Sequence, residues 1–308
     1  MSERVVYYNG EFVPEREARV SIYDLGVTQG AAAFEMLRSF HGLHFKLAEH
    51  LDRLEASCRT LGIPVPCRTT LETIIKEITE LNPHEPGDEH RLMIVASAGA
   101  APMYQEIVGD SPTLYIADFP LRLTTAGMGR QFQEGGRAII ANTRQVPDAC
   151  VPSWTKHRSR LHFHLAQAEA TLVCADWAIL LDHYGYVTEC PGANVFMVRH
   201  SVLSTPDRGC LCGISGQYVL ELADQLGIEH ERAPISDSTL LQADEVFVTG
   251  TPFCLLPITW LNGLPIGPIG PVYRRLLAAW SESVAVDIAG QIMAWDWAAT
   301  PRPTGTYA

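Results

Sequence analysis

The stretch Val187-Thr188-Glu189-Cys190-Pro191-Gly192-Ala193-Asn194-Val195-Phe196 joins two runs that have the pattern of short strands. We expect strands at residues 187–189 and 195–198, so that Glu189 ends the first strand among apolar neighbours. Burying a carboxylate alone is costly, and Glu189 therefore needs a partner. An arginine or a histidine is the commoner partner, and a protonated pyridine nitrogen of a bound molecule is another.

On both sides of this stretch, short strands and helices follow one another without strict alternation. Apolar residues recur every three or four positions at 47–61 and 71–81, which predicts two amphipathic helices in the first part of the chain. Further helices are expected at 161–172, from Ser215 to 226, and from Pro271 to about 289. This arrangement favours an α+β fold. The glycine-rich stretch 121–136 predicts an interdomain linker, between a first domain over 1–120 and a second over 137–308.

Lysine is scarce in this sequence. Only three of the 23 basic residues are lysines, and Lys156 stands alone beyond Lys76. Lysine can both condense with a carbonyl group and shuttle protons as a free amine. Lys156 is therefore a candidate catalytic residue, although a stray surface lysine in an arginine-rich sequence is the alternative.

Three features could hold an anion. In Gly213-Ile214-Ser215 a helix is expected to begin at Ser215, and its free N–H groups could bind a phosphate, although ordinary N-capping is the simpler role. Thr249-Gly250-Thr251 follows an apolar strand and could also hold an anion or form a plain turn. Arg53 lies beside the apolar stripe of its helix, where it could meet an anion or a solvated carboxylate.

Composition narrows the classes of function. The chain of 308 residues is 47% hydrophobic and carries a net charge of −12, which argues against nucleic acid as a partner. No apolar run is long enough to span a bilayer and no signal peptide is recognised, so we expect no membrane partner and a cytoplasmic location. The eight cysteines are scattered and expected to be free thiols. No metal site is expected, because Cys210 and Cys212 lack a second ligand pair and the histidines of 157–164 lack a carboxylate or cysteine at ligand spacing.

Several short pieces, in order over about residues 8 to 272, together resemble one family. They are Tyr8-Asn9-Gly10-Glu11-Phe12, Phe34-Glu35 with Arg38, Glu49-His50 with Arg53-Leu54, Lys156, Thr188-Glu189, Asn194-Val195-Phe196, Gly213-Ile214-Ser215, and Thr249-Gly250-Thr251. The set resembles the class IV pyridoxal-phosphate-dependent aminotransferases, which include branched-chain and D-amino-acid aminotransferases and aminodeoxychorismate lyase.

The resemblance implies a cofactor, a fold and roles for six residues. Lys156 resembles the Schiff-base lysine of pyridoxal 5'-phosphate, and Glu189 the partner of the pyridine nitrogen. The phosphate cradle is implied to consist of Arg53, the amides of Ile214 and Ser215, and Thr251. The implied fold is a small N-terminal α/β sandwich and a larger C-terminal pseudo-barrel domain with the cofactor between them, in a homodimer.

The residues expected to bind substrate depart from the family pattern. Ala98 and Pro252 stand where relatives offer an arginine or a backbone N–H to the substrate carboxylate, and Pro252 has no N–H to give. Replacements could come from Arg91, Arg144, His157, Arg158, Tyr104 or Trp154. We expect an aminotransferase acting on an amino acid or small amine and a 2-oxo acid. The alternatives are a lyase of the aminodeoxychorismate lyase type and a catalytically silent family member.

Overall fold

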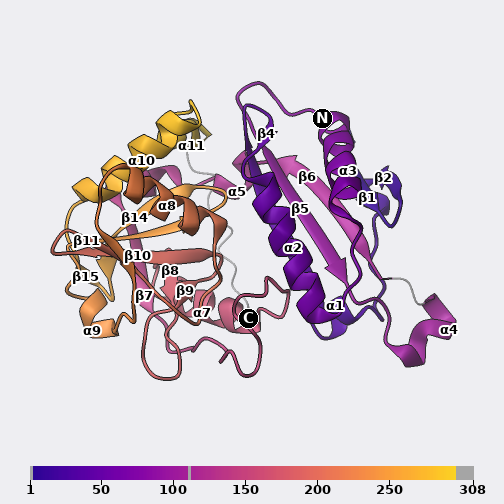
Figure 1. Ribbon diagram of the computed structural model, residues 1–308, viewed down its shortest axis with the longest axis horizontal. Coiled ribbons are helices and arrows are strands. Elements are labelled where there is room, and N and C mark those ends of the chain that lie inside the picture. The colour runs from indigo at the N-terminus through magenta and orange to yellow at the C-terminus, as the bar shows by residue number, and fades with distance from the viewer. Residues whose placement is uncertain (1–2, 110–111, 296–308) are drawn as a thin grey trace.

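The computed structural model describes residues 3–109 and 112–295, and it contains two β-sheets with helices around them (Figure 1). The ends of the two expected domains, residues 1–2 and 296–308, lie outside the described residues, as do residues 110–111. Each half of the chain forms one sheet with its own core. This mixture of separate helices and sheets is of the α+β class.

The first half forms an antiparallel sheet with the strand order β2-β1-β6-β5-β3-β4, counted over the described residues. Its strands are β1 (Val5–Tyr8), β2 (Glu11–Pro14), β3 (Ala32–Phe40), β4 (Leu43–His44), β5 (His90–Ser97) and β6 (Leu114–Pro120). Its helices are α1 (Leu25–Thr28), α2 (Leu47–Leu61), α3 (Arg68–Leu81) and α4 (Gln105–Val108), with 3-10 turns at Glu15–Glu17 and Pro102–Tyr104.

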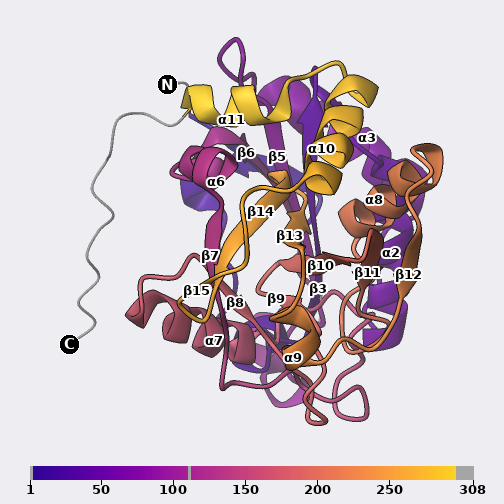
Figure 2. The ribbon, with the colours of Figure 1, turned by 90° about the vertical axis from the view of Figure 1, so that its left-hand side faces the viewer.

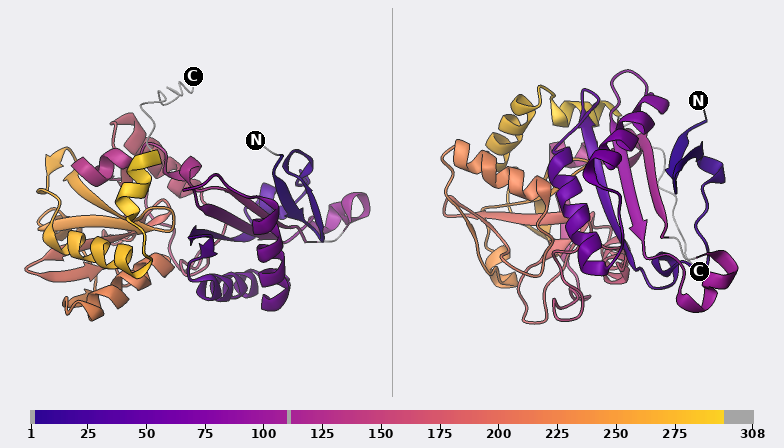
Figure 3. Two further views of the ribbon diagram at one scale, coloured as in Figure 1. Left: turned by 90° about the horizontal axis from the view of Figure 1, so that it is seen from above. Right: turned by 45° about the vertical axis from the view of Figure 1, so that its right-hand side comes forward.

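Helices α2 and α3 pack on one face of this sheet (Figure 3). The expected stripe of α2 is buried, with Leu51, Leu54 and Cys58 packed in the same core as Leu37 and Leu92 of the sheet. The helix ends at Gly62, whose φ of 68° suits a residue without a side chain. The amphipathic pattern thus predicted α2 correctly, and its buried apolar side chains pack the helix against the sheet.

The second half forms a mixed sheet, which in the described residues has the main order β12-β11-β10-β13-β14-β7-β8, with β15 beside β14 and β9 beside β10. Its strands are β7 (Gly136–Ile140), β8 (Trp177–Ile179), β9 (Glu189–Cys190), β10 (Ala193–Arg199), β11 (Val202–Thr205), β12 (His230–Arg232), β13 (Glu245–Gly250), β14 (Cys254–Leu261) and β15 (Leu264–Pro265). Its helices are α5 (Arg122–Thr125), α6 (Gly129–Glu134), α7 (Leu161–Leu172), α8 (Ile214–Gln225), α9 (Asp237–Leu240), α10 (Pro271–Ser283) and α11 (Ile288–Trp295).

Both faces of the second sheet are covered, as Figure 2 shows. Ala178 and Leu180 pack with α7, whereas Trp177, Ile179 and Leu181 belong to the larger core that includes α8 and α10. Successive residues of a strand point to opposite faces, so side chains from the chain around β8 pack alternately into the two cores.

Two expected boundaries differ in the structure. The stretch 121–136, expected as a linker, contains α5 and α6, and Phe132 of α6 joins the larger core of the second half. The predicted helix from Pro271 to about 289 is wrong in its length, because α10 ends at Ser283. The chain turns at Ala285, which has a φ of 52°, before α11 begins. The limits of the two domains remain a prediction.

Candidate active site

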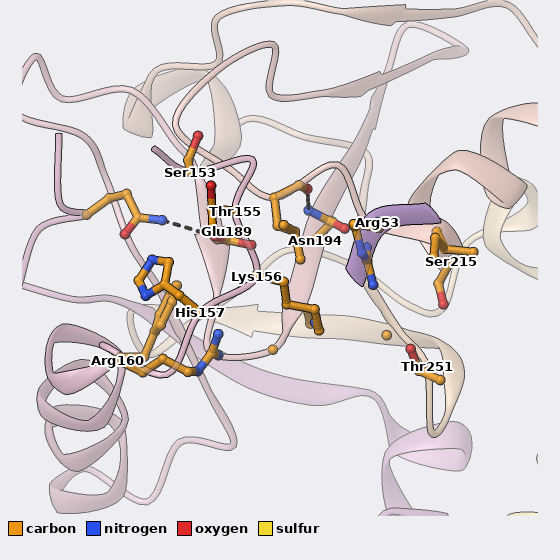
Figure 4. Close-up of a pocket in the computed structure, with 18 of the residues that line it drawn as sticks. Arg53, Ser153, Thr155, Lys156, His157, Arg160, Glu189, Asn194, Ser215 and Thr251 are labelled. Atoms are coloured by element: carbon orange, nitrogen blue, oxygen red, sulfur yellow. Dashed lines mark hydrogen bonds between the residues drawn. The ribbon is translucent and has the colours of Figure 1, made fainter. Parts of the chain in front are cut away.

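One pocket brings together all six site residues that the sequence analysis proposed (Figure 4). Arg53 comes from the first half of the chain and the other five come from the second. These residues are Arg53, Lys156, Glu189, Ile214, Ser215 and Thr251, and the same pocket is also lined by Gln145, Thr155, His157, Arg160 and Asn194. The pocket therefore lies where the two halves of the molecule meet.

Lys156 lies near the centre of this group (Figure 4). Its backbone amide donates a hydrogen bond to Ser57 Oγ of α2 at 3.1 Å, and its Nζ lies 4.9 Å from the centre of the Phe34 ring. Burial lowers the pKa of Lys156, and the nearby cations Arg53 and Arg160 lower it further. These effects outweigh the carboxylates of Glu35 and Glu189, so that the pKa falls to about 7. A substantial fraction of this amine is therefore uncharged and nucleophilic near neutral pH.

Glu189 begins strand β9 and is buried in the pocket wall. The side-chain amide of Gln145 donates a hydrogen bond of 3.0 Å to Glu189 Oε1. Burial raises the pKa of Glu189 to about 7, against the opposing influence of Arg160, the Leu211 amide and Lys156. The carboxyl group can therefore share a proton with a basic partner that enters the pocket.

The start of α8 forms a donor site. Its N-cap is Gly213, which has no side chain to cap the helix, so the first N–H groups of α8 face the pocket without a side-chain acceptor. Ser215 in the first turn and Thr251 just after β13 add hydroxyl groups. A methyl group at Gly213 would lie 1.9 Å from Asn194 Oδ1, so this close approach requires glycine. The free N–H groups at the start of α8 and the two hydroxyl groups together form a site that can bind an anion.

Arg53 is held in place by Glu35 of β3. Its Nε and Nη2 donate to the two Glu35 oxygens at 2.7 and 2.9 Å, and its Nη1 donates to the Cys212 carbonyl at 3.0 Å. Burial alone would raise the pKa of Glu35, but Arg53 and His50, whose ring lies 2.7 Å away, hold that pKa well below its usual range. Since a guanidinium has five N–H groups, Arg53 keeps donors for a further anion.

Sequence reasoning missed three residues of this arrangement. Glu35 was noted only as part of a matching motif, and Gln145 carried no signal at all. Arg160 lies within the cation-rich run 157–164, of which only His157 and Arg158 were expected as possible substrate-binding residues. The Arg160 guanidinium lies 4.4 Å from the centre of the Phe163 ring, and no hydrogen-bond acceptor for it is found among the described residues.

Of the suggested replacements for the substrate-binding residues, only His157 lines the pocket within the described part of the chain. Arg91 is buried in the first sheet, where its Nη1 donates to the Leu37 carbonyl at 3.4 Å. Arg158 lies over the Phe34 ring, and Tyr104 stacks on Tyr23. Arg144 and Trp154 are exposed.

The chain is similar to known proteins over most of its length. Residues 32–261 match the family described as "Amino-transferase class IV". A Methanocaldococcus jannaschii protein, provisionally named a branched-chain-amino-acid aminotransferase, is 32% identical over 88% of this chain and 93% of its own length. The D-alanine aminotransferase of Bacillus licheniformis is 28% identical over 92% of this chain and 98% of its own. The structure of the T.th. branched-chain amino acid aminotransferase with pyridoxamine 5'-phosphate aligns with a TM-score of 0.81 and 28% identity, over 96% of this chain and 97% of that one.

The chain belongs to the class IV aminotransferase family. The predicted family, the α+β fold class and the prediction of an aminotransferase are thereby confirmed. None of the described helices is long and apolar enough to cross a lipid bilayer.

Proposed function

We propose that the chain moves an amino group between an amino acid, or another small primary amine, and a 2-oxo acid, with pyridoxal 5'-phosphate as its cofactor. The proposal rests on one observation above all. Lys156, an amine with a pKa near 7, shares a pocket with the buried Glu189 and with the uncapped start of α8. This arrangement matches the three chemical features of the cofactor, which are an aldehyde, a basic ring nitrogen and a phosphate.

The residues present fit that cofactor. A phosphate dianion needs several N–H and O–H donors, and α8, Ser215, Thr251 and Arg53 offer them together. The Thr155 hydroxyl is buried and has no hydrogen-bond partner among the described residues, as expected for a group that faces a ligand. Glu189 would hold the ring nitrogen, and Lys156 would hold the aldehyde carbon covalently.

When bound, the cofactor supplies an electron-withdrawing ring that stabilises negative charge on the substrate α-carbon. Glu189 would keep the ring nitrogen protonated, because a carboxylate in a buried site favours a cation beside it. The neutral Nζ of Lys156 would accept the proton from the substrate α-carbon. For this its lowered pKa is needed, since an ordinary lysine stays protonated at neutral pH.

We propose that Arg160 binds the substrate carboxylate in place of the family residues that Ala98 and Pro252 replace. Pro252 has no N–H, and its carbonyl accepts a hydrogen bond from Arg38 at 3.1 Å. In the view of Figure 4 Arg160 lies on the other side of Lys156 from Ser215 and Thr251. A cation on that side of the pocket can receive a carboxylate while the phosphate occupies the far side.

The test is a panel of L- and D-amino acids and primary amines, offered to the purified chain with pyridoxal phosphate. Conversion of the aldehyde form of the cofactor to its amine form is followed by absorbance. We expect one equivalent of cofactor to be converted without an acceptor, and repeated turnover of the amino donor only when pyruvate or 2-oxoglutarate is supplied. Turnover without an acceptor acid would indicate a lyase, and a chain that stays colourless would indicate a silent member.

A homodimer and a cytoplasmic location remain predictions from the sequence. The dimer is supported by large apolar side chains that are exposed in one short segment of the monomer, namely Met103 at 76%, Ile107 at 68% and Val108 at 44%. Light scattering on the purified chain tests it, and a mass equal to 33.9 kDa at micromolar concentration would contradict it.

A further inference from the structure

A second group of polar side chains lies in the first half of the molecule, apart from the pocket. His84 lies in the connection between α3 and β5, His90 begins β5, and Asp118 lies in the neighbouring strand β6. His90 pairs with Pro120 and Leu92 pairs with Asp118, so His90 and Asp118 are diagonal neighbours on one face of the sheet. One ligand atom from each of the three residues lies within 4.8 Å of the others.

These three side chains are close together and almost completely withdrawn from water. The Nδ1 of His90 lies 2.8 Å and the Nε2 of His84 lies 3.3 Å from Asp118 Oδ2. The exposed fractions of the side chains are 13% for His90, 6% for His84 and 0% for Asp118. The two imidazole rings lie 4.2 Å apart between centres.

His90 and Asp118 form a hydrogen bond, but other polar atoms of the group have no hydrogen-bond partner. His84 Nε2 and Asp118 Oδ1 are buried and accept or donate no hydrogen bond among the described residues. The Nε2 of His44 is in the same condition, and the His44 ring stacks on that of His90 with 6.0 Å between centres. Buried polar atoms are nearly always satisfied, so His84 Nε2 and Asp118 Oδ1, which both lack a hydrogen bond, indicate a missing partner in this group.

A metal cation within this group would give His84 Nε2 and the Asp118 carboxylate the partner that they lack. We propose that His84, His90 and Asp118 bind a divalent transition metal ion, with Zn²⁺ as the expected ion. His44, whose ring stacks on that of His90, is the candidate fourth ligand. Two imidazole nitrogens and a carboxylate oxygen are a common ligand set for Zn²⁺. Ligands at about 2.0–2.1 Å from a tetrahedral zinc ion lie about 3.3 Å from one another, which the separation of His84 Nε2 and Asp118 Oδ2 matches. His90 Nδ1 and Asp118 Oδ2 lie 2.8 Å apart as a hydrogen-bonded pair, so they would have to separate by about 0.5 Å when an ion replaces the shared proton.

The role of the ion would be structural. None of the four residues lines the pocket around Lys156. The ion would tie the connection that contains His84 to strands β5 and β6, and His44 would add strand β4 at the edge of the sheet. The connection includes Pro83, Pro86 and Gly87, and it has no helix or strand of its own to hold it. Metal binding would thus stabilise the half of the molecule that carries Arg53.

The test uses the full chain, freed of metal with a chelator and with its exposed thiols blocked by alkylation, because cysteines such as Cys67 and Cys150 also bind zinc. We expect Zn²⁺ to bind in a ratio of one per chain by calorimetry and to raise the melting temperature. Co²⁺ should give the visible absorption of a tetrahedral site with nitrogen and oxygen ligands.

His84→Ala and Asp118→Asn should each weaken binding at least tenfold and abolish the rise in melting temperature. His230→Ala is the matched control, because His230 lies at the surface, where it pairs with Asp224 at 2.9 Å. Equal binding by the wild type, His84→Ala and His230→Ala would overturn the proposal, as would no binding at all. If Asp118→Asn does not fold, His84→Ala decides, because His84 lies in a connecting segment outside the sheet.

Discussion

The backbone carbonyl of Lys156 accepts a hydrogen bond of 3.0 Å from the amide of Phe34 in strand β3. Two residues on, the Arg158 amide donates to the Ala32 carbonyl at 2.9 Å. A segment from the second half of the chain therefore pairs with the edge of the sheet formed by the first half. This pairing places the Lys156 side chain beside Arg53 by backbone geometry, so we expect the two halves to build the pocket together.

Replacing Lys156 should abolish multiple-turnover transamination. In Lys156→Ala no other lysine can take its place, because Lys46 is bound to Glu221 at 3.0 Å and Lys76 is 80% exposed on α3. We expect a loss of at least a thousandfold in kcat, measured with an amino acid and 2-oxo acid pair. Lys76→Ala is the control and should keep wild-type activity. A Lys156→Ala enzyme with full turnover would refute its proposed role.

The lowered pKa of Lys156 should be visible in its reactivity. Only a neutral amine attacks an aldehyde, so Lys156 of the cofactor-free chain should react half-maximally with pyridoxal phosphate near pH 7. An ordinary lysine would need a pH near ~10.4. Borohydride reduction after brief exposure at each pH, followed by peptide mass spectrometry, measures this for each of the three lysines. Labelling of Lys156 that rises only above pH 9 would contradict the expected environment.

Glu35→Gln should loosen Arg53 and lower stability. Breaking a buried ion pair costs about 3 kcal/mol, so urea unfolding at pH 7 should show a loss of that size. The folded-state pKa of Glu35 is depressed, so its contribution is present above its ordinary pKa of about 4.5 and is lost as the pH falls below it. The difference between wild type and variant should therefore shrink between pH 4.5 and pH 3.

The control for this prediction is Glu55→Gln on α2, in the same half of the chain. Glu55 pairs with Arg59 at 2.6 Å, but both side chains are more than half exposed. Its loss should cost less than about 1 kcal/mol, because exposed ion pairs contribute little. A Glu35→Gln chain as stable as Glu55→Gln at pH 7 would show that Glu35 does not hold Arg53 in solution.

Gly213→Ala should distort the start of α8. Its methyl group would lie 1.9 Å from Asn194 Oδ1, so either the helix start or Asn194 must shift. We expect a loss of about 1–3 kcal/mol in stability and at least a tenfold weaker affinity for pyridoxal phosphate, measured by fluorescence titration. Gly267→Ala is the control outside the helix, where the nearest atom to a methyl group is the Asp244 carbonyl oxygen at 3.7 Å, an ordinary contact. Equal affinity in the two variants would argue against a phosphate site at this helix start.

Arg160→Ala should impair the reaction of amino acids more than the reaction of amines. Without the guanidinium, KM for an amino acid should rise about tenfold or more, because a charge-assisted hydrogen bond is worth about 1.5–3 kcal/mol. A primary amine without a carboxylate should lose less in kcat/KM than the amino acid, because for the amine only the rise in the pKa of Lys156 that follows the loss of the nearby cation opposes the reaction. Arg160→Lys should restore part of the amino-acid KM. An equal loss for both substrates would assign Arg160 to the pocket structure instead of substrate binding.

Much of the site could be predicted from local pattern. Glu189, Ser215 and Thr251 each lie at the end or start of an expected element, where a side chain can leave a sheet or helix toward a ligand. Lys156 was recognisable because no other lysine follows Lys76. The amphipathic period placed α2 with its buried stripe. The same kind of pattern could not predict that the last helix is interrupted at Ala285. The apolar pattern continues across the turn between α10 and α11, and only the backbone conformation shows the turn.

The sequence by itself singled out the residues that we propose carry the chemistry, since one isolated lysine and one strand-end carboxylate were recognisable without any contact being known. The tertiary structure decided how these side chains are held and how their pKa values are shifted. Glu35 holds Arg53 across 18 positions, and Gln145 reaches Glu189 across 44. The physical reason is that periodicity reports only which face of one element is buried. Contacts between elements, and with them the pKa of each buried group, depend on how strands pair and how the two halves dock.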